Sequence, residues 1–393
     1  MLKKPRILNP QKSDMDKNVY ILGAGFSKGL GLPLQDELLL FAKTVFFKDN
    51  DKFEHFKSVF TYQDKLSKMR KYLNYPLWNL EQLFNLVEMN NFYSKEGELS
   101  EIKKNFIQLI VDTILECTPD PFDTDTSLAK NKLNLKYTDR SLAKFELNPK
   151  YNDYLNFLNM FIEENENSGI KLHNDTIISF NYDLVIETVA CVFNLKKLKE
   201  KKDLANSGIK LNCTFGKNNI KITDLKETFG NKYSKKDFPP YADISPFALD
   251  NSPDRAIKLI KLHGSINWKT DDGEIFIVPP TWNKSDAEIK KLWEIAYEEL
   301  KQAKRIIVIG YSFPETDIYV KSLLALAVNE NKILQNIYFI NPDKDNARRS
   351  SLSLLDKNFE RYCEYKEWSF QDFVQKNEGT DFIKEKLGRK VLI

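Results

Sequence analysis

Residues 19–33 read Val-Tyr-Ile-Leu-Gly-Ala-Gly-Phe-Ser-Lys-Gly-Leu-Gly-Leu-Pro, and no other stretch says as much about the fold. The apolar run from Val19 to Leu22 predicts a short buried strand. The chain then turns through Gly23-Ala24-Gly25 toward a helix. Gly23 supplies the tight turn, and Gly25 lacks the Cβ that would block a close-lying phosphate. Because such a turn directs N–H groups and a helix dipole at an anion, it predicts a dinucleotide site.

Strand and helix patterns alternate along the rest of the chain. Strands are expected at residues 176–179, 257–262, 274–278, 305–309 and 337–340. Helices are expected at residues 183–192, 285–304 and 318–329. This alternation predicts an α/β fold, a Rossmann-like, doubly wound and mostly parallel sheet.

The chain is expected to form one domain that holds two insertions, with a tail at each end. Residues 1–18 are expected to form a flexible tail, and residues 19–355 one nucleotide-binding domain. Apolar spacing of the helical kind predicts a large helical insertion at about 36–170. The lysine-rich stretch at about 194–255 predicts a second insertion or a lid. Residues 356–393 are expected to be a tail that packs on the domain or on a partner.

Composition excludes several classes of protein. The 393 residues are 42% hydrophobic, enough for a large core, and the formal charge of +3 is too small to favour nucleic acid as the main ligand. No apolar run approaches the roughly 20 residues of a membrane span. The first 18 residues lack the apolar core of a secretory signal. The four cysteines are far apart and form no C-x-x-C, which favours the cytoplasm and predicts no metal site.

After residues 19–33, the second informative segment is the polar one that follows the strand predicted at 176–179. Asn181 and Asp183 stand where this strand gives way to a helix. Either residue could simply cap the helix by accepting its N–H groups. Alternatively, both line a ligand site, because ligands bind at the carboxyl ends of parallel strands.

The third segment reads Lys-Leu-His-Gly-Ser-Ile-Asn-Trp over residues 261–268. His263 is one of three histidines and directly follows a predicted strand. Gly264 beside it is expected to leave room above the imidazole. A histidine can be merely packed or exposed, but this position suits a base that takes a proton from a water or a ribose hydroxyl.

The fourth segment is Gly-Tyr-Ser-Phe-Pro-Glu-Thr-Asp over residues 310–317, again a glycine turn after a strand. Asp317 could cap the helix predicted to begin at Ile318. After the next strand, Asn341 is followed by Pro342-Asp343.

In this order, the four segments resemble the signatures of sirtuins and SIR2-like NAD-consuming proteins, over about residues 18–345. The resemblance implies that Asn181 and His263 are catalytic: Asn181 orients the water or the ribose, and His263 acts as the base. It implies that NAD⁺ is bound by the remaining matched positions, which are Gly23, Ala24, Gly25, Phe26, Ser27, Pro33, Asp183, Gly310, Ser312 and Asn341. Among these, Asp183 would read the nicotinamide carboxamide and Asn341 would hold the adenosine ribose.

The chain departs from the protein deacylases of that family. It has no pair of C-x-x-C motifs for zinc, and Gln35-Asp36 stand where deacylases have Phe-Arg. These departures favour hydrolysis of NAD⁺ without a metal. Nicotinamide leaves as a neutral group, so the site needs only preorganised dipoles and one base. The expected products are nicotinamide and ADP-ribose, or a cyclic form.

The resemblance extends to bacterial SIR2-like NADases of antiphage defence, whose helices cover the cofactor cleft. It implies a homo-oligomer and a separately encoded partner, such as a HerA-family ATPase or a short Argonaute. Residues 79–83 resemble a helix of those proteins. In this chain, Glu81 on that helix would either contact the site or make a surface salt bridge. The main alternative is a sensor that binds NAD or an ADP-ribose derivative without turnover, although a sensor needs neither Asn181 nor His263. A deacylase is the third alternative.

Overall fold

A seven-stranded, all-parallel sheet is the centre of this computed structural model. The structure describes residues 16–69, 80–93, 98–121, 147–165, 169–199, 208–213, 220–228, 247, 256–278, 287–314, 317–353 and 357–390. In spatial order the strands are β12 (Cys363–Lys366), β11 (Asn336–Ile340), β10 (Arg305–Ile309), β1 (Asn18–Leu22), β4 (Thr176–Ser179), β7 (Ala256–Lys261) and β5 (Lys210–Asn212). The predicted α/β fold is confirmed.

The central strands are apolar because both faces of the sheet are covered. All five residues of β1 are buried, as are all four of β4. Parallel sheets are covered by helices on both sides, so their strands read as continuous apolar runs. Val19 pairs with Ile306 of β10 on one side and with Thr176 of β4 on the other.

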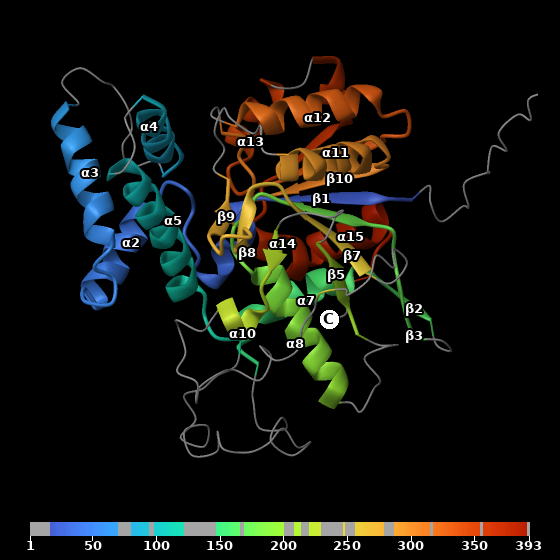
Figure 1. The fold of residues 1–393 in the computed structure, drawn as a ribbon. Coiled ribbons are helices and arrows are strands. Elements are labelled where there is room, and N and C mark those ends of the chain that lie inside the picture. The colour runs from blue at the N-terminus through green and yellow to red at the C-terminus, as the bar shows by residue number, and fades with distance from the viewer. Residues whose placement is uncertain are drawn as a thin grey trace, which may run out of the picture.

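Helices cover both faces of the sheet (Figure 1). One face carries α11 (Ala287–Lys301), α12 (Ile318–Glu330) and α13 (Lys344–Leu352). The other carries α7 (Asn152–Asn159), α8 (Val185–Lys199), α14 (Phe370–Gln375) and α15 (Asn377–Leu387). The chain builds the sheet outward from β1 through β4, then returns to the other side of β1 with β10. This reversal is the switch point at which doubly wound folds bind ligands.

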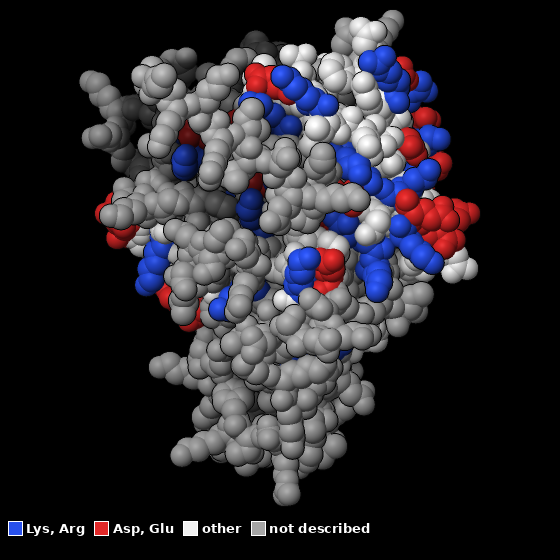
Figure 2. Space-filling view, turned by 90° about the vertical axis from the view of Figure 1, so that its right-hand side faces the viewer, with Lys and Arg blue, Asp and Glu red and all other residues white. Residues whose placement is uncertain are grey.

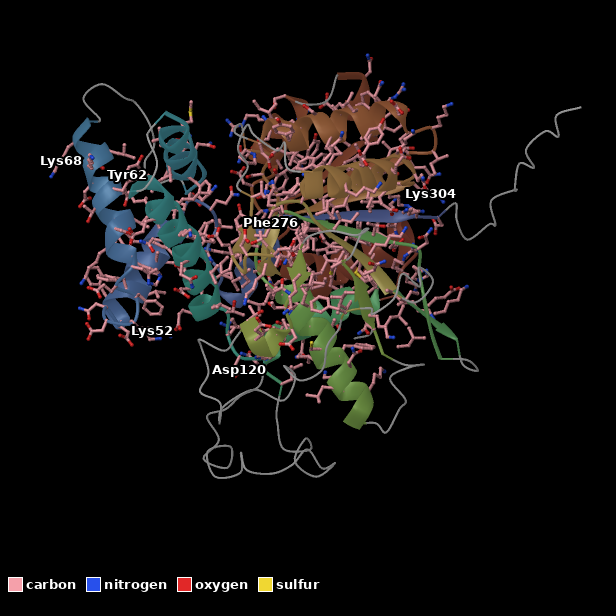
Figure 3. The ribbon with its side chains drawn as sticks, viewed as in Figure 1. Lys52, Tyr62, Lys68, Asp120, Phe276 and Lys304 are labelled. Atoms are coloured by element: carbon pink, nitrogen blue, oxygen red, sulfur yellow. The ribbon has the colours of Figure 1, made fainter. Side chains whose placement is uncertain are left out.

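The helical insertion stands beside the carboxyl ends of the strands (Figure 1). Its helices are α2 (Leu38–Lys48), α3 (Phe56–Met69), α4 (Leu80–Tyr93) and α5 (Glu98–Cys117). Figure 3 shows Lys68 projecting outward from α3, whereas Tyr62, which is buried, faces the neighbouring helices. Short elements complete this part of the chain: α1 (Ala24–Ser27), η1 (Lys28–Leu30), η3 (Pro149–Tyr151) and the hairpin of β2 (Ile162–Asn165) and β3 (Gly169–Leu172).

A second, three-stranded sheet differs from the predicted alternation. It contains β6 (Lys221–Ile222), β8 (Gly264–Lys269) and β9 (Ile275–Ile277), with α10 (Leu225–Thr228) beside it. The strand expected at 274–278 therefore exists, but it pairs antiparallel with β8 and not with the main sheet. Phe276 of β9 lies between the main sheet and the helical insertion (Figure 3).

Both ends of the predicted domain need correction. Asn18 begins β1, and Lys17 is 2% exposed, so at least the last two residues of the segment expected to be a tail belong to the domain. At the other end, residues 363–366 form β12 and pair with β11, which places part of the predicted tail in the sheet. The 3-10 helix η7 (Lys357–Tyr362) leads into that strand. Within the predicted second insertion, β5 also pairs with the main sheet, next to β7.

The face shown in Figure 2 is mixed in charge where the structure describes it. On this face, basic and acidic side chains lie next to one another. The described part of this face therefore lacks the one-signed potential that a phosphate backbone selects. Among the described residues, no helix is both long and apolar enough to cross a membrane.

Candidate functional site

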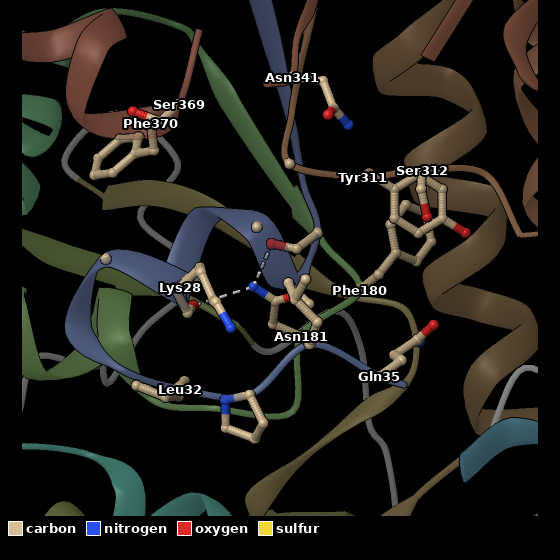
Figure 4. A pocket seen from close by; sticks show the side chains of 18 of the residues that line it. Lys28, Leu32, Gln35, Phe180, Asn181, Tyr311, Ser312, Asn341, Ser369 and Phe370 are labelled. Carbon is tan, nitrogen blue, oxygen red and sulfur yellow. Dashed lines mark hydrogen bonds between the residues drawn. The ribbon is translucent and has the colours of Figure 1, made fainter. Parts of the chain in front are cut away.

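A cavity of about 710 Å³ opens at the carboxyl ends of β1, β4, β10 and β11. Leu38 of α2 and Ile114 of α5 line it from the helical insertion, and Ser369 and Phe370 line it from the C-terminal segment (Figure 4). The structure brings most of the predicted binding residues to its wall: Gly23, Ala24, Gly25, Ser27, Pro33, Asn181, Asp183, Gly310, Ser312 and Asn341. Phe26 and His263 do not line it.

The two glycine turns pack against each other. A Cβ on Gly23 would lie 2.6 Å from the Cα of Tyr311, and one on Gly25 would lie 2.7 Å from the Cα of Gly310. The N–H of Gly25 also donates to the carbonyl of Gly310 at 2.9 Å. The missing Cβ of Gly25 is thus required by the neighbouring turn, and room for a phosphate, the reason given by the sequence, stays a prediction.

Gly310 is the residue of this contact most sensitive to substitution. Its φ is +62°, and a Cβ would lie 2.5 Å from the backbone of Gly25. We expect Gly310→Ala to lower the free energy of unfolding by about 3 kcal/mol, from left-handed strain plus overpacking. Gly388→Ala is the matched control, because φ there is +64° and the nearest atom, Asp16 Oδ2, is 3.6 Å away. It should cost about 1 kcal/mol in urea unfolding. Equal losses in the two variants would contradict the packing argument.

Phe26 is a core residue. It is 1% exposed, and its ring lies 4.4 Å from that of Phe370 and 5.2 Å from that of Tyr154, measured between centroids. Its ring thus packs the first turn against the C-terminal segment and does not line the cavity.

Asn181 lines the cavity with its amide held in place. Nδ2 donates to the carbonyl of Gly23 at 2.9 Å and to Ser27 Oγ at 3.3 Å (Figure 4). These bonds are not those of a helix cap, which was the alternative for this residue. With the amino group fixed, the carbonyl oxygen Oδ1 is the atom that can accept a hydrogen bond from a water or a ribose hydroxyl.

Asp183 both caps a helix and lines the cavity. Oδ1 accepts the N–H of Val185 at 3.1 Å near the start of α8, and Oδ2 accepts the hydroxyl of Ser27 at 2.7 Å. Burial raises the pKa of this carboxyl, although the charge of Lys261 and the Ser27 hydrogen bond oppose the rise. Lys261 Nζ lies beneath the turn, donating to the carbonyl of Asp183 at 2.5 Å and to Glu187 at 3.0 Å.

His263 lies behind the wall of the cavity. It is 1% exposed, and its Nε2 is 3.3 Å from Asp317 Oδ2. Its ring is 5.1 Å from that of Phe180, which stacks on Tyr311 at 4.5 Å. The expectation that Gly264 leaves room above the imidazole is wrong: φ there is +77°, and a Cβ would lie 2.2 Å from the carbonyl oxygen of Phe276. The cause is β9, which packs over this position.

Asp317 links His263 to the cavity. Its Oδ1 accepts the N–H of Val320, which confirms the predicted cap of α12. Its Oδ2 accepts the hydroxyl of Tyr311 at 2.7 Å as well as facing His263. Sequence reasoning assigned this aspartate the capping role alone, because nothing in the spacing of residues 311–317 shows which side chain lies across from it.

The second half of the sheet supplies the other end of the cavity. Ser312 follows the turn after β10, and Asn341 follows β11 (Figure 4). Asn341 Oδ1 accepts the N–H of Asp343 at 2.9 Å, and Asp343 caps α13. Residues 369–371 also line the cavity, which was not predicted from the sequence. Their local signal is the capping box of Ser369 and Asp372, which marks the start of helix α14. Glu81 belongs to α4, and its side chain lies outside the described residues.

Among the described residues, no group of His, Cys, Asp and Glu is arranged to hold a metal ion. A scan against protein-family models returns no match, and no curated protein matches the chain.

Proposed function

We propose that this chain is an NAD⁺ glycohydrolase that cleaves the bond between nicotinamide and ribose. The observation that carries the proposal is the cavity at the switch point, whose wall unites residues of the first, second and fourth sequence segments. Its volume falls within the range typical of small-molecule sites. The resemblance of these segments to SIR2-like proteins supplies the ligand, NAD⁺.

The chemistry needs few groups. Nicotinamide departs neutral, so the protein has to stabilise an oxocarbenium-like centre and position a water. The fixed amide of Asn181 suits the second task, because its donors are held by Gly23 and Ser27 and its Oδ1 can receive the water. His263 would take the proton from the water or from a ribose hydroxyl.

The position of His263 places a condition on this mechanism. Phe180 lines the cavity and packs against the imidazole, which is 1% exposed, so a catalytic His263 requires this part of the wall to rearrange when NAD⁺ binds. The same burial favours the second candidate, a sensor that binds NAD or ADP-ribose derivatives without turnover.

The resemblance further supports a role in antiphage defence by NAD⁺ depletion in the cytoplasm. It also supports a homo-oligomer that acts with a HerA-family ATPase or a short Argonaute. These biological assignments are part of the proposal, and they rest on the sequence motifs alone.

Turnover of NAD⁺ by the purified chain, with products separated by chromatography, tests the function. We expect nicotinamide and ADP-ribose from the parent. His263→Ala should retain NAD⁺ binding and lose product formation by about 100-fold or more, as expected for removal of a general base. A parent that binds NAD⁺ without forming product, alone or with neighbouring gene products, would contradict the hydrolase and support the sensor.

A further inference from the structure

We propose that Lys28 binds the diphosphate of the dinucleotide, exchanging the carboxylate of Glu37 for the ligand. Nothing in the four sequence segments marks this lysine. The inference rests on the dinucleotide ligand of the proposed function, and not on its cleavage.

Lys28 differs in charge from the other ionisable residues that line the cavity. Three acidic residues line the cavity, Asp36, Asp183 and Asp343, whereas Lys28 is the one lysine or arginine among its described lining residues. Its side chain is 43% exposed, and Figure 4 shows it among the side chains that line the cavity. A diphosphate carries two negative charges, so a nearby cation favours its binding in this acidic setting.

The glycine turn offers the negative diphosphate fewer N–H donors and a weaker helix dipole than its sequence predicts. The N–H of Gly25 donates to Gly310, and the N–H of Phe26 donates to Gly23 at 2.9 Å. Helix α1 that follows has only four residues, too short for a substantial macrodipole. A side-chain cation next to the turn can replace these donors, and Lys28 directly follows α1.

Glu37 is a partner that a ligand can displace. Lys28 Nζ forms an ion pair with Glu37, whose carboxylate also accepts the N–H of Leu34 at 2.9 Å. The Glu37 side chain is 33% exposed, and partly exposed ion pairs of this kind contribute little stability. A phosphate offers Lys28 a charge-assisted bond of the same kind as the one to Glu37, and a lysine on a flexible stem can turn from one anion to the other.

Two substitutions with opposite expected effects test the exchange. Lys28→Met should weaken ADP-ribose binding by about tenfold, the loss of one charge-assisted hydrogen bond, and leave adenosine binding unchanged. Glu37→Gln should tighten ADP-ribose binding by about threefold, because the amide oxygen still accepts from Leu34 but no longer holds the lysine by charge. Lys43→Met, an exposed lysine of α2 outside the cavity wall, is the matched control and should change neither affinity.

Calorimetric titration of the full chain with ADP-ribose and with adenosine measures these affinities. Equal ADP-ribose affinities for Lys28→Met and Lys43→Met, weaker binding by Glu37→Gln, or no ADP-ribose binding by the parent would each overturn the assignment. NAD⁺ turnover of the same samples separates the two proposals. Lys28-dependent ADP-ribose binding without cleavage, both alone and with neighbouring gene products, refutes only the hydrolase, and cleavage with Lys28-independent binding refutes only the lysine assignment.

Discussion

Replacing Asn181 by alanine is expected to lower kcat for NAD⁺ cleavage by about 100- to 1,000-fold, with a small change in KM. Asn181 lines the cavity, and its amide is oriented by Gly23 and Ser27, so its contribution is greatest where a water must be held in one direction. Loss of one preorganised polar group at a reacting centre typically has an effect of this size. Steady-state kinetics over a range of NAD⁺ concentrations measures both constants.

Asn341→Ala is the control for this prediction. Asn341 also lines the cavity, but it follows β11, on the far side of β10 from the strand that carries Asn181. If it holds the adenosine ribose, its removal should raise KM by about tenfold and leave kcat within about threefold. Because Asn181→Ala also removes bonds that brace the first turn, ADP-ribose binding should be measured in parallel. A tenfold loss of that binding in Asn181→Ala would show that the residue supports the turn and not the reaction.

The sequence was informative wherever one strand ends in a turn, and uninformative wherever two distant turns meet. The run from Val19 to Gly25 predicted both the strand and the glycine turn, since a buried parallel strand is apolar throughout. It did not show that Gly25 packs on Gly310, because that contact joins residues 285 positions apart. The local pattern of a glycine turn is the same whether its open side faces a phosphate or another backbone.

His263 shows the same limit at the candidate site. Its place after β7 was predicted within one residue, which put it at the correct edge of the sheet. Its burial depends on β8 and β9, and their antiparallel pairing breaks the strand–helix alternation. The pairing of His263 with Asp317 likewise depends on how β10 and β7 are placed in the sheet. Side chains from separate strands meet only after the sheet order is fixed.

Replacing Arg389 by methionine is expected to lower the free energy of unfolding by about 3–5 kcal/mol, the cost typical of removing one partner of a buried ion pair. Arg389 follows α15 and binds Asp175 through two nitrogens, Nε to Oδ2 and Nη2 to Oδ1, both at 2.7 Å. The side chains are 3% and 0% exposed. Burial alone would lower the pKa of Arg389, but Asp175 outweighs it and raises that pKa, so the guanidinium stays charged.

The pair connects the C-terminal segment to the start of the central strands. Asp175 also accepts the N–H of Asn18 at 2.8 Å, so Arg389→Met would leave a buried carboxylate with too few donors beside β1. The double variant Asp175→Asn/Arg389→Met removes both charges and should recover about half of the loss, because an amide is less costly to bury than an unpaired carboxylate. Urea unfolding of the parent, the single variant and the double variant measures the difference. Since α14 contributes Phe370 to the cavity wall, a weakened C-terminal segment should also reduce ADP-ribose affinity. A double variant no more stable than Arg389→Met would show that Arg389 contributes by packing and not by neutralising Asp175.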